Sequence, residues 1–346
     1  MTDSEQSKLI ISSAALAADA ADDAHDDADS VVDVELRQVS VPLESHGSRL
    51  DRALALAVPE FSRSYLQQLI AAGAVQLNGL TAVKPSAGVK AGDELRIELK
   101  PTPQSQAFKP EAMALDVVFE DDFLMVLNKP AGLVVHPAPG NWSGTLLNGL
   151  LARDTQASLL PRAGIVHRLD KDTSGLMVVA RQRQVMDQLV SMIAARSVSR
   201  QYVALAHGAW QGPKTRRVDL PVGRDPRNRL RMAVVDMDRH PGKTATTDIS
   251  VLSSGTGHCL VQCKLHTGRT HQIRVHMAAL GHPLVADVLY GGQPAAGLER
   301  QALHAWRLAF VHPVTAKPLE FNLPLPADME AAIAGLGLRY NRGEQV

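Results

Sequence analysis

The sequence predicts an α+β protein whose strands form a largely antiparallel, mixed sheet. Short β-type runs follow one another along the chain, several of them without a helix between. A doubly wound parallel sheet would need a crossover helix between successive strands, so that architecture is disfavoured. At 346 residues and 45% hydrophobic content, the chain is long enough to bury a core in about two domains.

The N-terminal segment, residues 1–45, differs in composition from the rest. Its first 36 residues are rich in Ala, Asp and Ser and hold ten acidic residues against one basic residue, Lys8. Such a segment buries little apolar surface, so we expect a disordered acidic tail. Because the whole chain is formally neutral, the remainder carries a net charge of about +9, which suits a polyanionic partner. A surface that is merely soluble explains this charge equally well.

Residues 46–100 are expected to form a small α+β domain. Two apolar series at helical spacing predict two short helices, the second with Ser62 as its N-cap and Gly73 as its stop. A short strand is expected at 75–77, followed by an Asn78–Gly79 turn and a final strand at 94–99. The proline-rich residues 101–112 are typical of a linker.

A larger domain is expected over residues 113–328, followed by a C-terminal tail at 329–346. Apolar runs and alternation predict its strands at 124–127, 165–169, 176–180, 202–206 and 260–265. Helical spacing predicts its helices at 145–152, 185–194 and 271–280.

The chain has no sequence feature that directs it out of the cytoplasm. No apolar run approaches the ~18 residues of a membrane span, and the N-terminus lacks the pattern of a signal peptide. The two cysteines, Cys259 and Cys263, lie four residues apart in one expected strand, so we expect buried thiols rather than a disulfide. We therefore expect a cytoplasmic protein with no membrane partner.

The densest polar cluster runs from Gly164 to Gly175 and reads GIVHRLDKDTSG. Asp170 falls in a loop at the end of an expected strand, where a scaffold can present a carboxylate to a ligand. The alternative is an ordinary turn of Asp, Ser and Thr closed by Gly175, and spacing alone slightly favours that alternative.

A second cluster contains three histidines at five-residue intervals, His266, His271 and His276. On a helix this spacing rotates each side chain by about 140° from the last, and the glutamate of the zinc helix signature is absent. We therefore expect no metal site. Arg269 and Arg274, near the expected helix start, could meet a phosphate or a carboxylate, or could be surface arginines. The sequence also lacks a phosphate-binding loop and a dinucleotide fingerprint, so no cofactor is expected.

These stretches together resemble the RluA family of pseudouridine synthases. GIVHRLDKDTSG resembles the catalytic motif, and further matching stretches lie at 128–137, 200–202, 266–276, 281–284 and 287–292. Residues 48–99 resemble the S4-like RNA-binding domain. The resemblance covers about 46–328 and implies the pseudouridine synthase fold, isomerisation of uridine to pseudouridine, and no cofactor.

The resemblance implies a role for several residues. Asp170 would be the nucleophile, attacking either the anomeric carbon of the ribose or C6 of the base. Tyr202 would stack on the base, where the C5 proton must be removed. Arg274 would pair with Asp170, keeping it ionised and aimed.

Further residues are implied to bind the RNA. Arg168 would hold the target uridine flipped out, and Ile273 would form an apolar wall of the pocket. The same motifs add His167 and Arg269 as substrate contacts. In the N-terminal domain the candidate phosphate contacts are Arg49, Arg52, Arg63 and Lys84, although any one of them could equally be an ordinary exposed cation.

Within the family the likeness is greatest to enzymes of the large ribosomal subunit. It implies large-subunit (23S) ribosomal RNA, or its assembly precursor, as the partner of a monomeric enzyme, with transfer RNA as the alternative substrate. A non-catalytic RNA-binding ribosome-assembly factor would predict a damaged motif, whereas Asp170, Tyr202 and Arg274 are intact. A metal-dependent hydrolase built on the histidines is a third alternative, which metal analysis would separate.

Overall fold

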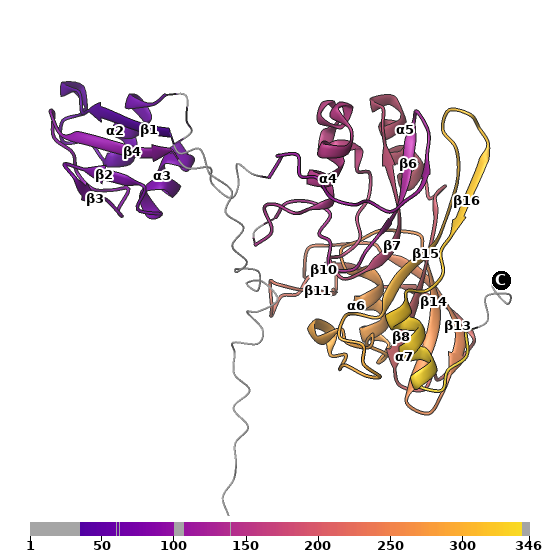
Figure 1. Ribbon diagram of the computed structural model, residues 1–346. Coiled ribbons are helices and arrows are strands. Elements are labelled where there is room, and N and C mark those ends of the chain that lie inside the picture. The colour runs from indigo at the N-terminus through magenta and orange to yellow at the C-terminus, as the bar shows by residue number, and fades with distance from the viewer. Residues whose placement is uncertain (1–34, 60, 62, 100–106, 139, 341–346) are drawn as a thin grey trace, which may run out of the picture. The chain divides into compact units, whose positions relative to one another are not determined.

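The computed structural model describes residues 35–59, 61, 63–99, 107–138 and 140–340 (Figure 1). The chain divides into two compact units. The first comprises the described residues up to Lys109 together with Ala138–Ser143, and the second comprises Pro110–Pro137 and the residues from Gly144 onward. Most of the predicted acidic tail, residues 1–34, and residues 101–106 of the predicted linker lie outside the described residues.

The first unit is a four-stranded antiparallel sheet with two helices. The strand order is β1 (Glu35–Ser40), β4 (Glu94–Leu99), β2 (Val75–Leu77) and β3 (Leu80–Thr81). The helices are α2 (Leu50–Ala57) and α3 (Arg63–Ala71), as their apolar spacing predicted. Leu54 and Ile70 from the helices are fully buried in one cluster with Ile97 of β4, which joins the helices to the sheet.

The turns of this unit follow the predicted chemistry. Asn78 and Gly79 both have positive φ, which is the conformation of the tight hairpin between β2 and β3. Gly73, with φ of +70°, follows the end of α3. The predicted N-cap, Ser62, lies outside the described residues.

The N-terminal boundary of this unit differs from the prediction of a tail to residue 45. Residues 35–40 form β1 and pair antiparallel with all six residues of β4. A short 3-10 helix, η2 (Leu43–Ser45), follows, and Val41 is buried. The strand was missed because its apolar content is low, and its stability comes from pairing with a partner 54 to 64 residues away rather than from local pattern.

The second unit is built on a nine-stranded sheet (Figure 1). Its strands run in the spatial order β5 (Val117–Glu120), β6 (Leu124–Lys129), β7 (Ser174–Ala180), β15 (Leu303–Val311), β8 (Ser199–His207), β14 (His258–Leu265), β13 (Thr246–Ser254) and β9 (Thr215–Asp219), with β16 (Pro318–Asn322) paired to β15. A separate three-stranded sheet contains β11 (Met232–Val234), β10 (Val222–Arg224) and β12 (Gly242–Lys243).

The pairing confirms the predicted fold class. Among the strand pairs of the described residues, β7 and β15 pair in parallel and the other pairs are antiparallel. The parallel pair is short, with His304 opposite Ser174 and Ala305 opposite Gly175. It lies where the predicted catalytic motif enters the sheet.

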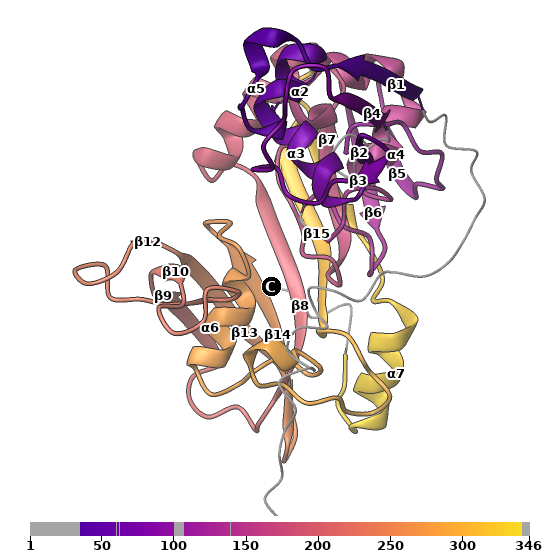
Figure 2. The ribbon, with the colours of Figure 1, turned by 90° about the vertical axis from the view of Figure 1, so that its left-hand side faces the viewer.

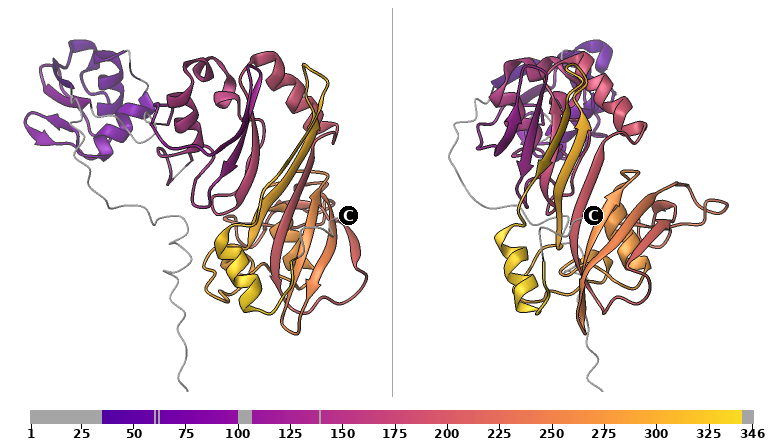
Figure 3. Two further views of the ribbon diagram at one scale, coloured as in Figure 1. Left: turned by 45° about the vertical axis from the view of Figure 1, so that its right-hand side comes forward. Right: turned by 90° about the vertical axis from the view of Figure 1, so that its right-hand side faces the viewer.

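Helices cover both faces of this sheet. Residues of α4 (Leu146–Arg153) and α6 (Gln272–Ala279) share a core with Tyr202 and Ala204 of β8. The opposite face of β8, with Val203, packs with α7 (Ala327–Gly335), and α5 (Arg183–Ala194) covers the same face near β7. Figures 2 and 3 show α6 and α7 on opposite sides of β8 and β14.

Two predicted segments of this unit differ from the structure. Residues 165–169 form a loop with one isolated bridge, Ile165 to Val179, instead of a strand. Residues 329–340 are not a tail, since α7 begins at Ala327 and buries Met329 in the core, and Leu338, beyond the end of α7, is buried in the same core. Residues 341–346 lie outside the described part. No helix among the described residues is long and apolar enough to span a membrane.

Candidate active site

The loop that carries Asp170 is held in place from several sides. It runs from Ile165 to Thr173, between the 3-10 helix η5 (Pro161–Gly164) and β7. The three residues after Asp170 are each held by a hydrogen bond from another segment. Lys129 Nζ donates to the Lys171 carbonyl (2.8 Å) and Arg300 Nη1 donates to the Asp172 carbonyl (3.0 Å). Gln301 Nε2 donates to Thr173 Oγ1 (2.9 Å). The nucleophile predicted from sequence therefore stands on a rigid support.

Lys129, which contacts this loop, is a buried charged side chain with 1% exposure. Its ammonium donates to the carbonyls of Pro130, Leu133 and Lys171 at 2.7 to 2.8 Å. Burial lowers the pKa of Lys129 to about 7. Its three hydrogen bonds tie the segment at 130–133 to the residue next to Asp170.

Gly175 fixes the exit of the loop. Its φ is +114°, and a Cβ at this position would clash with the Ala305 carbonyl oxygen of β15. Only glycine permits both this backbone conformation and this close approach of two parallel strands. The neighbouring Ser174 hydroxyl is hydrogen bonded to His304 Nδ1 at 2.9 Å, so the sheet register and the loop are fixed together.

Arg274 joins two carboxylates. Its Nη1 donates to Asp170 Oδ2 at 3.2 Å, while Nε and Nη2 form a bidentate pair with Asp287 at 2.8 and 2.7 Å. The guanidinium also lies over the ring of Tyr290, 5.0 Å from its centroid. Burial alone would lower the pKa of Arg274, but the hydrogen bonds to Asp287 together with the negative charges of Asp287 and Asp170 raise that pKa. Asp287 and Tyr290 thus hold the guanidinium in an orientation that points Nη1 of Arg274 at Asp170.

His271 stands at the N-terminus of α6 on the other side of Asp170. Its Nε2 is 3.9 Å from Asp170 Oδ1, and its Nδ1 is 2.8 Å from the Tyr290 hydroxyl. That hydroxyl accepts a hydrogen bond from the Met232 amide and can donate its own proton to Nδ1; in that arrangement the imidazole proton lies on Nε2, facing Asp170. Burial lowers the pKa of His271. The residue has a left-handed backbone (φ 56°), a conformation that is uncommon outside glycine.

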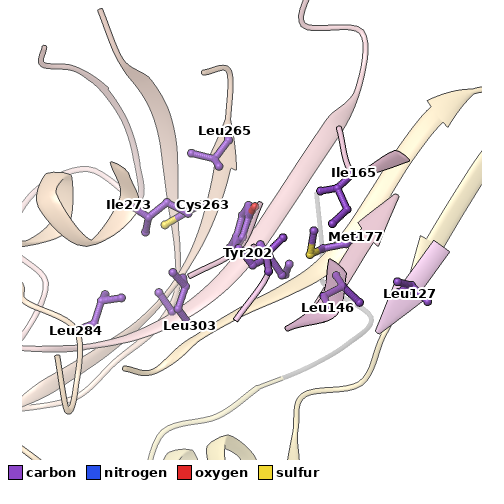
Figure 4. Close-up of a cluster of buried hydrophobic side chains, with 14 of the residues drawn as sticks. Leu127, Leu146, Ile165, Met177, Tyr202, Cys263, Leu265, Ile273, Leu284 and Leu303 are labelled. Carbon is purple, nitrogen blue, oxygen red and sulfur yellow. The ribbon is translucent and has the colours of Figure 1, made fainter. Parts of the chain in front are cut away.

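Tyr202 lies on β8 and forms part of the apolar wall of the site. It is 5% exposed, and Figure 4 shows it between Cys263 and Ile273 on one side and Ile165 and Met177 on the other. Burial raises the pKa of Tyr202 to about 12, and the charge of Asp170 acts in the same direction. The side chain is therefore a neutral phenol at neutral pH.

The structure brings the predicted catalytic and substrate-contact residues into one pocket of about 350 Å³. Asp170 is its one carboxylate among the described lining residues, which also include Arg168, Arg196, Arg200, Tyr202, Arg269, Ile273, Arg274 and His167. A pocket with five arginines and one carboxylate suits a ligand that carries negative charge.

The predicted substrate contacts differ in their freedom within this pocket. Arg168 is exposed. Arg269 is half-buried and donates from Nε to the Thr244 carbonyl at 3.1 Å. His167 accepts a hydrogen bond at Nε2 from the Val178 amide of β7 (3.1 Å), and burial lowers its pKa to about 3. Ile273 is buried and contributes to the wall.

The three histidines of the second cluster have separate environments. His266 is paired with Asp248 at 2.6 Å, His271 faces Asp170, and His276 is buried against Thr247 and the Leu220 carbonyl. Among the described residues, no group of three or more His, Cys, Asp or Glu side chains is placed to hold a metal ion.

The four predicted phosphate contacts of the first unit lie around the start of α2. Arg49 and Arg63 both pair with the buried carboxylate of Asp51, at 3.1 and 2.8 Å. Lys84 precedes Pro85, whose carbonyl accepts from the Asp51 amide at 3.1 Å. Arg52 and Lys84 are exposed. Two of the four cations, Arg49 and Arg63, are thus partly engaged by Asp51.

Several residues of the site had no role assigned from sequence. Lys129, Arg200, Asp287 and Tyr290 all fall within the stretches that match the family, and that match was the available signal. Their roles depend on contacts across more than ten residues of chain, such as Arg274 to Asp287, which no local spacing encodes.

Each of the two units matches a known family. Residues 123–279 match the family model described as RNA pseudouridylate synthase, and residues 48–95 match the S4 domain. Ribosomal large subunit pseudouridine synthase D of Neisseria meningitidis serogroup A is 47% identical over 87% of this chain and 82% of its own length. The protein of that name from Xanthomonas campestris pv. campestris is 44% identical over 90% of this chain and 96% of its own. The solved structure of human RNA pseudouridylate synthase domain containing 4 matches with a TM-score of 0.52 and 25% identity, covering 65% of this chain and 94% of that one.

Proposed function

The chain belongs to the RNA pseudouridylate synthase family, and we propose that it isomerises uridines of large-subunit ribosomal RNA with Asp170 as the nucleophile. The observation that carries this assignment of the nucleophile is the hydrogen bond from Arg274 Nη1 to Asp170 at 3.2 Å, in a pocket where Asp170 is the one carboxylate among the described lining residues.

The reaction moves the ribose from N1 to C5 of the same base. The bond between N1 and C1′ breaks with its electron pair passing to the uracil ring, and a bond forms between C5 and C1′. The proton of C5 is then lost and N1 gains one, so the reaction is an isomerisation without a redox change. A carboxylate can act as covalent catalyst by bonding either to C1′ or to C6, and it is released when the new bond is complete.

The surrounding residues support a fixed nucleophile. Asp287 and Tyr290 hold the guanidinium of Arg274, which in turn holds Asp170. A preset carboxylate needs little reorganisation before it attacks, which is how positioning lowers a barrier. Tyr202 and Ile273 offer an apolar surface on which a flipped-out base can stack.

The ribosomal substrate is supported by the names of the relatives and by the S4 domain at residues 48–95. The basic patch around α2 would contact phosphates without reading sequence. We also propose that the enzyme works as a monomer in the cytoplasm.

The test is a map of pseudouridine across total RNA from cells that lack the gene, complemented with wild type or with Asp170→Asn. We expect positions in large-subunit ribosomal RNA to lose the modification and to regain it with wild type alone. Loss confined to transfer RNA would assign the enzyme to the other substrate. Recovery with the Asn variant would remove Asp170 from the role of nucleophile.

A further inference from the structure

Arg200 is a buried cation in the active-site pocket to which the proposed mechanism gives no task. It lies two residues before Tyr202 on β8, so both side chains leave the same face of the strand. It is 6% exposed and lines the pocket. Its neighbour across the sheet is Leu265, on β14, which also lines the pocket.

The guanidinium of Arg200 forms no hydrogen bond or ion pair with any described residue, and its Nε is fully buried without a partner. Arg274, in the same pocket, is by contrast bound to two carboxylates. A buried arginine is stable only when its charge and its N–H groups are matched. The described residues therefore leave this guanidinium available to a partner from outside the chain.

The chain leaves room for this guanidinium at Gly268. A Cβ at position 268 would lie 2.8 Å from Arg200 Nη1, so any other residue there would displace the arginine. Gly268 has no positive φ that would otherwise call for glycine. The glycine at this position leaves space for the end of the arginine side chain.

His167 supplies a second donor without a partner in the same pocket. Its Nε2 accepts from the Val178 amide, so the proton of the neutral ring is on Nδ1. That Nδ1 is buried and has no hydrogen-bond partner among the described residues. Burial and the nearby charge of Arg200 lower the pKa of His167 to about 3, which keeps the ring neutral and Nδ1 a donor.

We propose that Arg200, with His167 as a second donor, binds a negatively charged oxygen of the target nucleotide inside the pocket. This inference rests on the proposed function. Two groups of the substrate present such an oxygen: the backbone phosphate beside the flipped-out nucleotide, and the carbonyl oxygens of uracil, which take up the electron pair when the bond between N1 and C1′ breaks. An unmatched buried donor suits either, because the charge is supplied only when substrate is bound or reacting.

The test compares Arg200→Met with wild type in the full chain, using unmodified large-subunit ribosomal RNA transcribed in vitro. The readouts are RNA affinity as a function of salt, the single-turnover rate at saturating enzyme, and the melting temperature. Arg183→Met serves as the control, since Arg183 is an exposed arginine on α5, paired with Asp187 of its own helix. The control should match wild type in all three readouts.

The two sources of the anion give different results. A phosphate contact predicts weaker binding and a log-log salt slope smaller by about 0.7 to 0.9, with the saturating rate unchanged. A contact to the uracil oxygens predicts unchanged affinity and a saturating rate about 100-fold lower. In that second case RNA containing 5-fluorouridine should restore part of the missing rate of ribose transfer, because fluorouracil is more acidic and its anion leaves more readily.

Two outcomes would overturn the proposal. One is an Arg200→Met protein with affinity and rate within twofold of wild type. The other is a loss of activity that accompanies a lower melting temperature, because removal of an unpaired buried charge should leave stability unchanged or higher. Should wild type itself modify no uridine, the proposed function fails instead. If wild type is active, Asp170→Asn is inactive and Arg200→Met is as active as wild type, the proposed function stands and only the inference about Arg200 is overturned.

Discussion

At the scale of single residues, the pocket is organised by one guanidinium shared between two carboxylates. Asp287 takes two N–H groups of Arg274 and has 1% side-chain exposure, while Asp170 takes one and is 17% exposed. The buried partner therefore fixes the arginine, and the accessible partner is free to react. The difference between the two carboxylates is one of environment, because both are aspartates bound to the same cation.

The first prediction concerns Asp170. Asp170→Asn keeps the shape of the side chain but replaces the carboxylate by an amide, which is a poor nucleophile. We expect pseudouridine formation to be abolished while RNA affinity stays within a few-fold of wild type. Turnover and equilibrium binding measured on the same RNA check this. More than a few per cent of wild-type turnover would contradict it.

The second prediction concerns the hydroxyl of Tyr202. Tyr202→Phe keeps the ring for stacking and removes the oxygen, so we expect unchanged RNA affinity and, if the phenolate takes the C5 proton, turnover about 100-fold lower. Because burial raises the pKa of Tyr202 to about 12, the phenolate fraction grows as the pH rises toward that value. Wild-type turnover should then increase between about pH 7 and 9 and that of the variant should not. Equal turnover of the two proteins would exclude the phenol oxygen as the base.

Much of the site could be predicted at this scale from the sequence, and its limits are physical. Asp170, Tyr202 and Arg274 were placed by their motifs, and the structure brings them to one pocket. Asp287, Tyr290 and Arg200 were present in matching stretches, but nothing in a linear pattern states which arginine is paired and which is not. That distinction exists only after folding.

At the scale of elements, the helices and hairpins could be predicted from the local pattern of apolar and turn residues, whereas strands without a strong alternating pattern could not. The helix α4 begins after Thr145, whose side chain and that of Asn148 form a capping box. By contrast β1 is defined by its pairing with β4, and residues 165–169 look like a strand but make the loop that carries Asp170. Apolar runs of about five residues do not separate a strand from a buried loop.

The third prediction concerns the pairing of α2 with α3 through Asp51. Asp51 is fully buried and accepts hydrogen bonds from Arg49, Arg63 and Gln67. Burial alone would raise the pKa of its carboxyl, but these hydrogen bonds hold that pKa below its usual range. We expect Asp51→Asn to destabilise the N-terminal unit by about 1–3 kcal/mol at neutral pH. Hydrogen exchange of the amides of α2 and α3 measures this.

The contribution of Asp51 to the stability of the N-terminal unit depends on pH. A carboxyl whose folded-state pKa is depressed contributes stability above the unfolded value, 3.8, and loses it as the pH falls through the folded pKa. The difference between wild type and Asp51→Asn should therefore shrink as the pH is lowered below about 4. A difference that is constant with pH would mean that shape, and not charge, is what Asp51 contributes.

At the scale of the whole molecule, the residues for chemistry and the candidate phosphate contacts outside the pocket lie in different units. Asp170, Tyr202 and Arg274 belong to the second unit, and Arg49, Arg52, Arg63 and Lys84 to the first. The two-domain organisation was predictable because composition and motifs change along the chain. The ends of the units were not, since β1 and α7 are held by contacts rather than by their own composition.

The fourth prediction follows from this division. Removal of residues 1–109 should weaken RNA binding and flatten its salt dependence, by roughly 0.7 to 0.9 of the log-log slope for each phosphate that the shortened protein no longer binds. The rate at saturating RNA should be largely preserved, because the pocket is complete in the second unit. The double variant Arg52→Gln, Lys84→Gln in the full chain should show a smaller loss of RNA affinity and a smaller decrease of the salt slope. An unchanged slope, or a saturating rate that falls with the truncation, would contradict it.

The parallel pairing of β7 with β15 also bears on the stage of synthesis at which the active-site loop can be held in place. The loop after Asp170 is tied to Arg300, Gln301 and His304, which lie 128 to 130 residues farther along the chain. Contacts so distant close late and slowly during folding. On the ribosome, at about 5–20 residues per second, roughly ten seconds separate the synthesis of Asp170 from that of the strand that anchors its loop. We therefore expect a chain that ends before β15 to lack the ordered loop and to be inactive.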